Sequence, residues 1–315
     1  MQYNLLGNTG IRVSKICFGS LTIGPLQKNL PIKEGVGILE KAVDYGINFI
    51  DTADLYGTYP YIKEVVKKNR DLVIATKSYA YNRETAEQTL RRALDGIGRD
   101  YVDIFLLHEQ ESIHTIHGHR EALDYFIEQK EKGLIRAVGI STHYIAAVKS
   151  AALLNEIDVI HPILNFRGLG IVDGPRSMME QAIESAYRMG KGIYIMKPLG
   201  GGHCIKDYHE AFKYALEFPY AHAIAIGMQR LEELEANICK LEGLPIPPPL
   251  ESALAGYKRT LLIQDWCQAC GECVRRCSQG ALRIGEEGIA AVDKEKCILC
   301  GYCGSVCKEL AIKVI

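Results

Sequence analysis

The chain carries the run CQACGECVRRC at residues 267–277 and the run CILCGYCGSVC at residues 297–307. Both runs have the spacing C-x2-C-x2-C-x3-C, and each cysteine of the first run recurs 30 residues later. The apolar residues that follow repeat as well, since Ala281 and Leu282 correspond to Ala311 and Ile312. The repeat indicates an internal duplication that folds as a small module of its own.

The cysteines are distributed unevenly along the chain. Of 11 cysteines in 315 residues, only Cys17, Cys204 and Cys239 lie outside the two runs. The other eight are Cys267, Cys270, Cys273, Cys277, Cys297, Cys300, Cys303 and Cys307. Cytosolic thiols are kept reduced, so this crowding favours metal ligation over disulfides. Soft thiolates suit iron–sulfur clusters, and the short spacing lets three successive cysteines surround one cluster. A pair of zinc sites is the alternative, although structural zinc needs four thiolates per ion and no third x2 step.

Residues 257–315 resemble the bacterial two-cluster ferredoxins. The resemblance implies one [4Fe-4S] cluster on Cys267, Cys270, Cys273 and Cys307, and a second on Cys297, Cys300, Cys303 and Cys277. The chain departs from the ferredoxin pattern after each fourth cysteine, where Ser278 and Lys308 replace the usual proline. This change is expected to loosen the local turn without removing a ligand.

A proline-rich segment precedes the cysteine module. Residues 243–256 include Pro245, Pro247, Pro248 and Pro249, a composition typical of an extended, semi-rigid spacer without regular structure. We therefore expect a large domain over residues 1–242, a linker over 243–256 and the ferredoxin-like domain over 257–315. At about 3 Å per residue, such a spacer could reach either end of the large domain.

The large domain alternates short apolar, β-branched runs with segments of helical periodicity. Glycines at positions 46, 133 and 190 stand between a helical segment and the next strand, as helix C-caps do. Before the first expected strand, residues 5–13 are predicted to form a hairpin that caps one end of the domain. The eight expected strands are residues 16–18, 47–51, 72–76, 103–107, 135–140, 157–160, 193–196 and 223–226. Eight such units predict an α/β fold, a (β/α)8 TIM barrel followed by a small α+β ferredoxin-like domain; an open doubly wound sheet is the alternative.

Polar residues stand where three neighbouring strands end. Asp51 ends the second strand and Tyr56 follows in its loop, while Lys77 and His108 end the third and fourth. Reactive groups of such barrels project from these strand ends. The segments 49–57 (FIDTADLYG), 75–77 (ATK) and 106–108 (LLH) are similar to the active-site motifs of the aldo-keto reductases. The resemblance extends over roughly residues 2–240.

The resemblance to the aldo-keto reductases implies a role for each of these four residues. Tyr56 would protonate a carbonyl oxygen while hydride reaches its carbon, and would act as base in the reverse direction. Lys77 would lower the pKa of the phenol, which is about 10 in water. Asp51 would keep Lys77 charged, and His108 would orient the carbonyl.

The same resemblance implies a nicotinamide site. Ser141 and Asn165 would hold the carboxamide. Pro198, Leu199 and Gly200 would lie under the cofactor, and the adenosine end would meet Gly227, Met228, Arg230, Glu233 and Asn237. Met196 and Lys197 replace the tyrosine and serine usual in the family. NADP and NAD both remain open, because a 2′-phosphate favours arginine and a free ribose hydroxyl favours a carboxylate, and Arg230 and Glu233 supply one of each.

Composition limits the partners. The chain has 37 basic and 38 acidic side chains, so no electrostatic field favours a nucleic acid or an anionic membrane surface. No basic leader and no apolar run of about 18 residues is visible, and we expect a soluble, cytoplasmic protein. Small molecules and proteins are the expected partners.

These features predict an NAD(P)-dependent oxidoreductase that interconverts a small carbonyl and alcohol, with clusters that exchange electrons with a protein donor or acceptor. A hydride carries two electrons and a cluster one, and no flavin motif is visible to link them. One alternative is an electron-transfer or nicotinamide-sensing subunit whose barrel is not catalytic. Another is an ordinary reductase with structural clusters.

Overall fold

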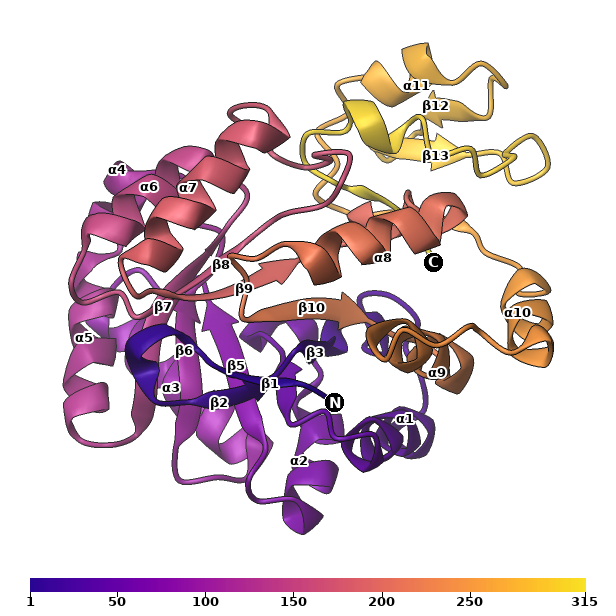
Figure 1. Cartoon of the computed structure of the whole chain (residues 1–315). Coiled ribbons are helices and arrows are strands. Elements are labelled where there is room, and N and C mark those ends of the chain that lie inside the picture. Colours follow the sequence, from indigo (N-terminus) through magenta and orange to yellow (C-terminus); the bar gives the residue numbers. More distant parts are fainter.

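The computed structural model describes residues 1–315, and its larger part is a closed barrel of eight parallel strands (Figure 1). The ring runs in the order β10-β3-β4-β5-β6-β7-β8-β9. Its strands are β3 (Ile16–Gly19), β4 (Phe49–Asp51), β5 (Val73–Ser78), β6 (Val102–Leu107), β7 (Ile135–Thr142), β8 (Val159–Pro162), β9 (Gly192–Met196) and β10 (Ala223–Gly227). Each predicted strand falls on an observed one. The prediction of a (β/α)8 barrel is confirmed, and the closed ring excludes the open sheet.

Helices connect successive strands and cover the outside of the barrel (Figure 1). They are α1 (Ile32–Asp44), α2 (Tyr59–Lys68), α3 (Arg83–Ile97), α4 (Ile113–Gly118), α5 (Arg120–Glu131), α6 (Ile145–Leu153), α7 (Arg176–Arg188), α8 (Tyr208–Glu217) and α9 (Leu231–Leu241). No helix of the chain combines the length and the apolar composition that a membrane crossing requires.

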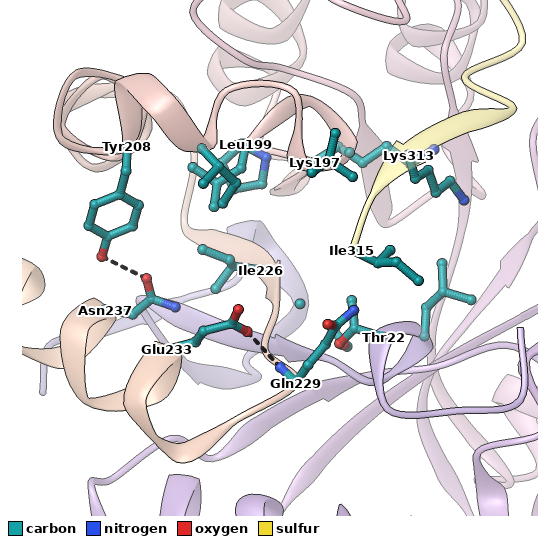
Figure 2. A pocket seen from close by; sticks show the side chains of 18 of the residues that line it. Thr22, Lys197, Leu199, Tyr208, Ile226, Gln229, Glu233, Asn237, Lys313 and Ile315 are labelled. Carbon is teal, nitrogen blue, oxygen red and sulfur yellow. Dashed lines mark hydrogen bonds between the residues drawn. The ribbon is translucent and has the colours of Figure 1, made fainter. Parts of the chain in front are cut away.

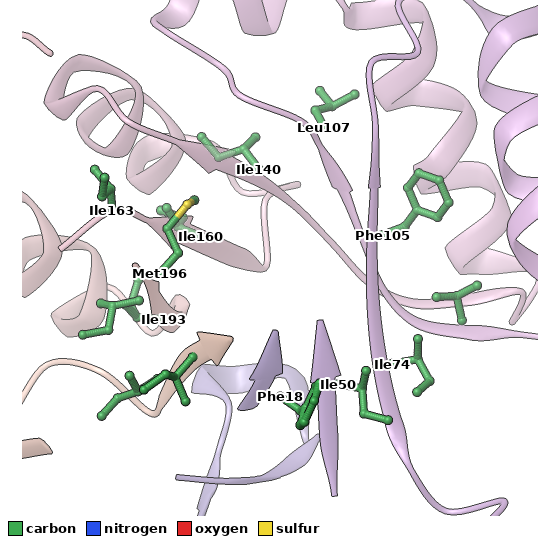
Figure 3. Close-up of a cluster of buried hydrophobic side chains, with 14 of the residues drawn as sticks. Phe18, Ile50, Ile74, Phe105, Leu107, Ile140, Ile160, Ile163, Ile193 and Met196 are labelled. Carbon is green, nitrogen blue, oxygen red and sulfur yellow. The ribbon is translucent and has the colours of Figure 1, made fainter. Parts of the chain in front are cut away.

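The strands are apolar on both faces because both faces are buried. Alternate side chains point outward and pack against the helices, among them Phe18, Ile50, Ile74 and Phe105 (Figure 3). The intervening side chains point inward and form a separate core that includes Phe49, Val73, Ile104 and Val159. This alternation decides which residues at the strand ends face the barrel axis.

A hairpin closes the N-terminal end of the barrel, as predicted. Strands β1 (Tyr3–Leu5) and β2 (Arg12–Ser14) pair antiparallel around a short 3-10 turn, and Leu6, Ile11 and Val13 join the inner core. The opposite end, where the strands finish, is left for the site.

The C-terminal module contains two small antiparallel sheets and one short helix. Strand β11 (Leu261–Ile263) pairs with β14 (Ile312–Val314), and β12 (Leu282–Ile284) pairs with β13 (Ala290–Val292). Helix α11 (Glu272–Arg276) lies within the first cysteine run. Because the first and last strands pair, the two repeats close into one α+β unit, as predicted.

The predicted linker is not free of regular structure, and that part of the prediction is wrong. Residues Pro248–Ala255 form helix α10, with Pro247 at the N-cap and Pro248 and Pro249 in the first turn. Proline is tolerated there because the first backbone N–H groups of a helix have no partner within it. The three prolines therefore begin a helix.

The module docks on the end of the barrel where the strands finish (Figure 1). Strand β14 runs against the turn Gly200–Gly202 that follows β9; Gly202 has φ +90°, and a Cβ there would meet the carbonyl oxygen of Val314 at 2.0 Å. His203 Nε2 donates a hydrogen bond to the carbonyl of Ile312 at 2.7 Å. Leu310 is 1% exposed and belongs to the outer core of the barrel. The two domains thus share an apolar contact and a backbone contact.

Candidate active site

An ion pair joins the ends of strands β4 and β5. Asp51 follows Phe49 by two residues and Lys77 follows Ala75 by two, so both point into the barrel. Lys77 is 1% exposed and its Nζ lies 2.7 Å from Asp51 Oδ2. The same ammonium donates to the carbonyl of Thr52 at 2.7 Å. The buried charge of Lys77 is thus neutralised and hydrogen-bonded.

The second oxygen of Asp51 is held from the far side of the barrel. Tyr194 donates its hydroxyl to Asp51 Oδ1 at 3.0 Å, and His161 stacks on Tyr194 with its Nε2 3.6 Å from the same oxygen. Burial lowers the pKa of His161 to about 4, although Asp51 opposes that shift. Sequence reasoning missed Tyr194 and His161. Their inward positions on β9 and β8 were the signal available.

Tyr56 and His108 complete the group of four predicted residues. The Tyr56 ring lies 4.8 Å from Lys77 Nζ and makes an edge contact with the His108 ring, with centroids 5.8 Å apart. Tyr79 stacks on the other side of His108 at 4.5 Å. Burial and the charge of Lys77 hold the pKa of His108 well below its usual value, so this imidazole is neutral. Its Nδ1 is buried without a partner.

The pKa of Tyr56 departs from expectation. Burial raises it well above its usual value, and the charges of Asp51 and Glu109 raise it further. The predicted lowering by Lys77 is not seen, because that ammonium is turned toward Asp51 and Thr52. At neutral pH the Tyr56 hydroxyl therefore keeps its proton and can donate it.

A cavity of about 480 Å³ opens beside these residues (Figure 2). Asp51, Tyr56 and His161 lie in its wall, which continues along the loops after β3, β9 and β10. Five residues expected at the nicotinamide site line it: Pro198, Leu199, Gly227, Glu233 and Asn237. Helix α10 and the last residues of β14 close the cavity from outside the barrel. The last strand of the cysteine module therefore forms part of the wall.

Five other residues expected at the nicotinamide site lie outside this cavity. The Ser141 hydroxyl accepts a hydrogen bond from the Glu109 N–H, and the Asn165 amide is bonded to both backbone groups of Leu169. Gly200 packs against Leu169 and Cys204. Met228 is fully buried, and Arg230 pairs with Glu232. The side chains of Ser141 and Asn165 thus hydrogen-bond backbone groups of neighbouring loops. A single sequence does not reveal such contacts.

One buried polar atom in the cavity wall, outside the group around Tyr56, has no hydrogen-bond partner. Gln229 lies in the wall, and its buried Oε1 has no hydrogen-bond partner. Its backbone N–H donates to Glu233, which also pairs with Arg259 at 2.9 Å (Figure 2). Tyr208 donates to Asn237 at 2.8 Å. A cavity of this size with apolar walls and a few polar groups is typical of a small-molecule or cofactor site.

The eight module cysteines are free and fall into two groups. Cys277, Cys297, Cys300 and Cys303 line one small cavity. In the other group, burial raises the pKa of Cys273, and the nearby thiols of Cys267, Cys307 and Cys270 raise it further. Each group thus combines three cysteines of one run with the fourth of the other.

The donor set of the module fits clusters better than single ions. Backbone N–H groups of Ala281 and Ala290 point at the sulfur atoms of Cys277 and Cys267, at 3.3 and 3.5 Å. Hydrogen bonds of this kind accompany cluster sulfur ligands. The repeated C-x2-C-x2-C-x3-C spacing points the same way, because a structural zinc site needs four thiolates and no third x2 step.

Comparison with known proteins agrees with the barrel and with the cysteine module. The sequence profile of the aldo/keto reductase family matches residues 15–215. The chain belongs to the aldo/keto reductase family. A second profile, that of the 4Fe-4S dicluster domain, matches residues 266–311. The combination is therefore an aldo/keto reductase barrel followed by a 4Fe-4S ferredoxin domain.

Individual relatives of this aldo/keto reductase are distant. It is 24% identical over 288 residues to the uncharacterized oxidoreductase YqkF of Bacillus subtilis (76% of this chain, 90% of that one). It is 22% identical over 284 residues to the L-galactose dehydrogenase of Arabidopsis thaliana (78% and 89%). The aldo-keto reductase AKR11C1 from Bacillus halodurans superposes with a TM-score of 0.66 at 19% identity, over 81% of this chain and 95% of that one. Such structural likeness shows the shared barrel.

Proposed function

We propose that this aldo/keto reductase transfers a hydride between a nicotinamide dinucleotide, NADP or NAD, and a small carbonyl or alcohol. The proposal rests on one observation: Tyr56, in the wall of the large cavity, has its ring beside the Lys77–Asp51 pair and in contact with the neutral His108. An acid, its supporting cation and an orienting imidazole are the groups that carbonyl reduction needs.

In this proposal Tyr56 is the proton donor. Its raised pKa keeps the hydroxyl protonated, so it can give its proton to a carbonyl oxygen as negative charge develops there. Lys77 holds positive charge 4.8 Å from the phenol ring and stabilises the phenolate that remains. Asp51 fixes the lysine. Neutral His108 can donate a hydrogen bond that orients the carbonyl without competing as an acid.

The dinucleotide, when bound, supplies the hydride. We propose that Pro198, Leu199 and Gly227 contact its middle part, and that Glu233 and Asn237 hold its adenosine end with Gln229 and Arg259. Burial beneath α10 and β14 would exclude water from the hydride path.

For the module, we propose one [4Fe-4S] cluster on Cys267, Cys270, Cys273 and Cys307, and another on Cys277, Cys297, Cys300 and Cys303. Clusters bound there supply one-electron transfer with a protein donor or acceptor. The hydride of the dinucleotide and the proton of Tyr56 together complete the reduction of a carbonyl. The barrel reaction therefore needs no electron from a cluster.

Replacing Tyr56 with Phe tests the proposal. The phenyl ring keeps the packing and loses the proton, so kcat for carbonyl reduction should fall about 10²- to 10⁴-fold. Binding of reduced nicotinamide, followed by its fluorescence, should be unchanged. Turnover in the variant equal to wild type would contradict the proposal.

A second candidate function is suggested by the residues Val314 and Ile315, which belong to the cluster domain and line the same cavity. In this alternative the barrel binds nicotinamide without turnover, and occupancy is sensed by the clusters. Anaerobic titration with reduced nicotinamide, with and without carbonyl compounds, distinguishes the two. A change in the cluster spectra on nicotinamide binding, without oxidation of the nicotinamide and without carbonyl consumption, supports sensing, and carbonyl consumption supports the enzyme.

A further inference from the structure

Two lysines from different domains meet at the cavity that holds Tyr56. Lys197 directly follows strand β9 of the barrel, and Lys313 is the middle residue of strand β14 in the cluster domain. Both line the cavity, and Lys313 reaches into it from the C-terminal strand on the side of Lys197 (Figure 2).

Neither lysine has a carboxylate partner. Lys197 Nζ lies 2.8 Å from His143 Nε2, and the strongly lowered pKa of His143 makes that imidazole the acceptor. Lys313 is 5% exposed, and its ammonium lies 4.8 Å from the centre of the Trp266 ring.

The cavity wall contains three carboxylate side chains, those of Asp51, Glu233 and Glu251, and none forms an ion pair with Lys197 or Lys313. Asp51 pairs with Lys77, and Glu233 pairs with Arg259. The acid that acts on both lysines is Glu109, which accepts the hydroxyl of Tyr79 and forms no ion pair with either. Enclosing two ammonium groups without a directly paired carboxylate is unfavourable, so an anion that enters from outside would stabilise the site.

The position of the two lysines indicates which anion. The charge of Lys197 lowers the pKa of His108, and the charges of both lysines lower that of His143. Lys197 thus acts on His108, which contacts Tyr56, and Lys313 lines the same cavity as Tyr56. Gln229, Glu233 and Asn237 line this cavity from the segment after β10.

We propose that Lys197 and Lys313 bind a carboxylate or phosphate group carried by the carbonyl substrate, so that the cluster domain completes the substrate site of the barrel. This inference rests on the proposed function for the identity of the substrate, and its anion site can be tested without turnover. Oxo acids and phosphorylated aldehydes or ketones are the compounds that fit.

Binding is measured on the full, cluster-loaded chain by isothermal titration calorimetry under anaerobic conditions. The probes are oxamate, an unreactive analogue of a 2-oxo acid, and inorganic phosphate, each with and without nicotinamide dinucleotide. Lys313→Met and Lys197→Met should each weaken binding of one of these probes about tenfold or more, because each removes a hydrogen-bonded charge. The probe that binds more tightly shows whether the site prefers a carboxylate or a phosphate group.

Lys294→Met is the matched control, since this lysine is exposed in the same domain and forms no ion pair. It should bind the probes like wild type. The cluster absorption bands must be retained in all three variants. Equal binding by wild type and Lys313→Met, or no binding of either probe, overturns the proposal. So does weakened binding of the dinucleotide with unchanged binding of the probes, which assigns the lysines to the cofactor pyrophosphate.

Kinetics give an independent readout. With pyruvate and methyl pyruvate as a charged and a neutral probe, Lys313→Met should raise KM for pyruvate and leave KM for the ester unchanged. An equal change for both probes overturns the anion site. If no carbonyl is reduced by wild type while oxamate binding depends on Lys313, the proposed function fails and the anion site stands.

Discussion

Lys77 and Lys313 are both enclosed at the mouth of the barrel, at 1% and 5% exposure, and their surroundings are opposite. Lys77 lies 2.7 Å from a carboxylate and from a carbonyl oxygen, all within neighbouring strands of one sheet. Lys313 comes from another domain and faces Lys197, His143 and an aromatic ring. Burial lowers the pKa of Lys313 to about 7.

The difference shows how one fold uses buried charge in two ways. At the strand ends the charge of Lys77 is neutralised within the protein by Asp51, so it is part of the folded structure. Under β14 the charge is left without a partner, so it lowers stability until a ligand supplies the partner.

The largest effect is expected at Lys77. Lys77→Met removes the cation and leaves Asp51 buried and unpaired, which should cost about 3–5 kcal/mol of folding stability. Thermal unfolding of the anaerobic protein measures it. Asp51→Asn combined with Lys77→Met should recover part of the loss, since no charge then remains buried. An additive loss in the double variant would mean that the two residues do not act as a pair.

The opposite sign is expected at Lys313. Lys313→Met removes a desolvated ammonium and keeps its volume, so the ligand-free protein should gain about 1–4 kcal/mol. The pH dependence of this stability gain follows from the difference between the pKa of Lys313 in the folded and in the unfolded chain. The unfolded chain binds the proton up to pH about 10.5 and the folded chain only up to about 7, so the gain should be greatest at pH 7 and below and should shrink as the pH rises toward 10.5. A loss of stability at pH 7 would contradict this.

Anion binding should also weaken as the pH rises. The pKa values of Lys313 and Lys197 are lowered to about 7 and about 8, so oxamate should bind most tightly below pH 7 and more weakly as the pH rises through 8. His143 and His108 stay neutral in this range. Calorimetry from pH 6 to 9 measures the effect. In Lys313→Met the loss of oxamate affinity should occur at a higher pH, near the pKa of Lys197. A pH profile equal to that of wild type would count against the account.

The smallest effect is expected where β14 is docked. His203→Phe fills the space beside Gly304 and loses the hydrogen bond to Ile312, which should cost about 1 kcal/mol. Its transition temperature should fall by a few degrees, and oxamate affinity should fall less than in Lys313→Met. A larger loss of affinity than at Lys313 would show that docking, and not charge, governs the site.

The sequence was sufficient for features that depend on local periodicity. All eight strands, the strand-end positions of Asp51, Lys77 and His108, and the duplicated cysteine runs follow from patterns within one segment each. Their meeting in space follows from the geometry of a parallel barrel.

Other features depend on contacts between distant segments, which no single-sequence pattern encodes. The approach of Lys313 to Lys197 requires the docking of β14 on Gly202, and helix α10 requires three prolines to begin a helix. Ser141 and Asn165 are predicted to hold the cofactor carboxamide, and their hydrogen bonds to the N–H of Glu109 and the backbone of Leu169 are contacts that the sequence does not reveal. The pKa of Tyr56 rises because burial outweighs a cation that is already paired.

The most direct test follows a label from nicotinamide to product. Reduced nicotinamide dinucleotide carrying deuterium at C4 is mixed with the anaerobic protein and a panel of 2-oxo acids and neutral carbonyls, and the products are analysed by mass spectrometry. The account predicts deuterium at the former carbonyl carbon with wild-type protein, and about 1% of that rate or less with Tyr56→Phe at unchanged nucleotide binding. Nucleotide binding by wild type with no deuterium in any product, or transfer by Tyr56→Phe at the wild-type rate, would contradict it.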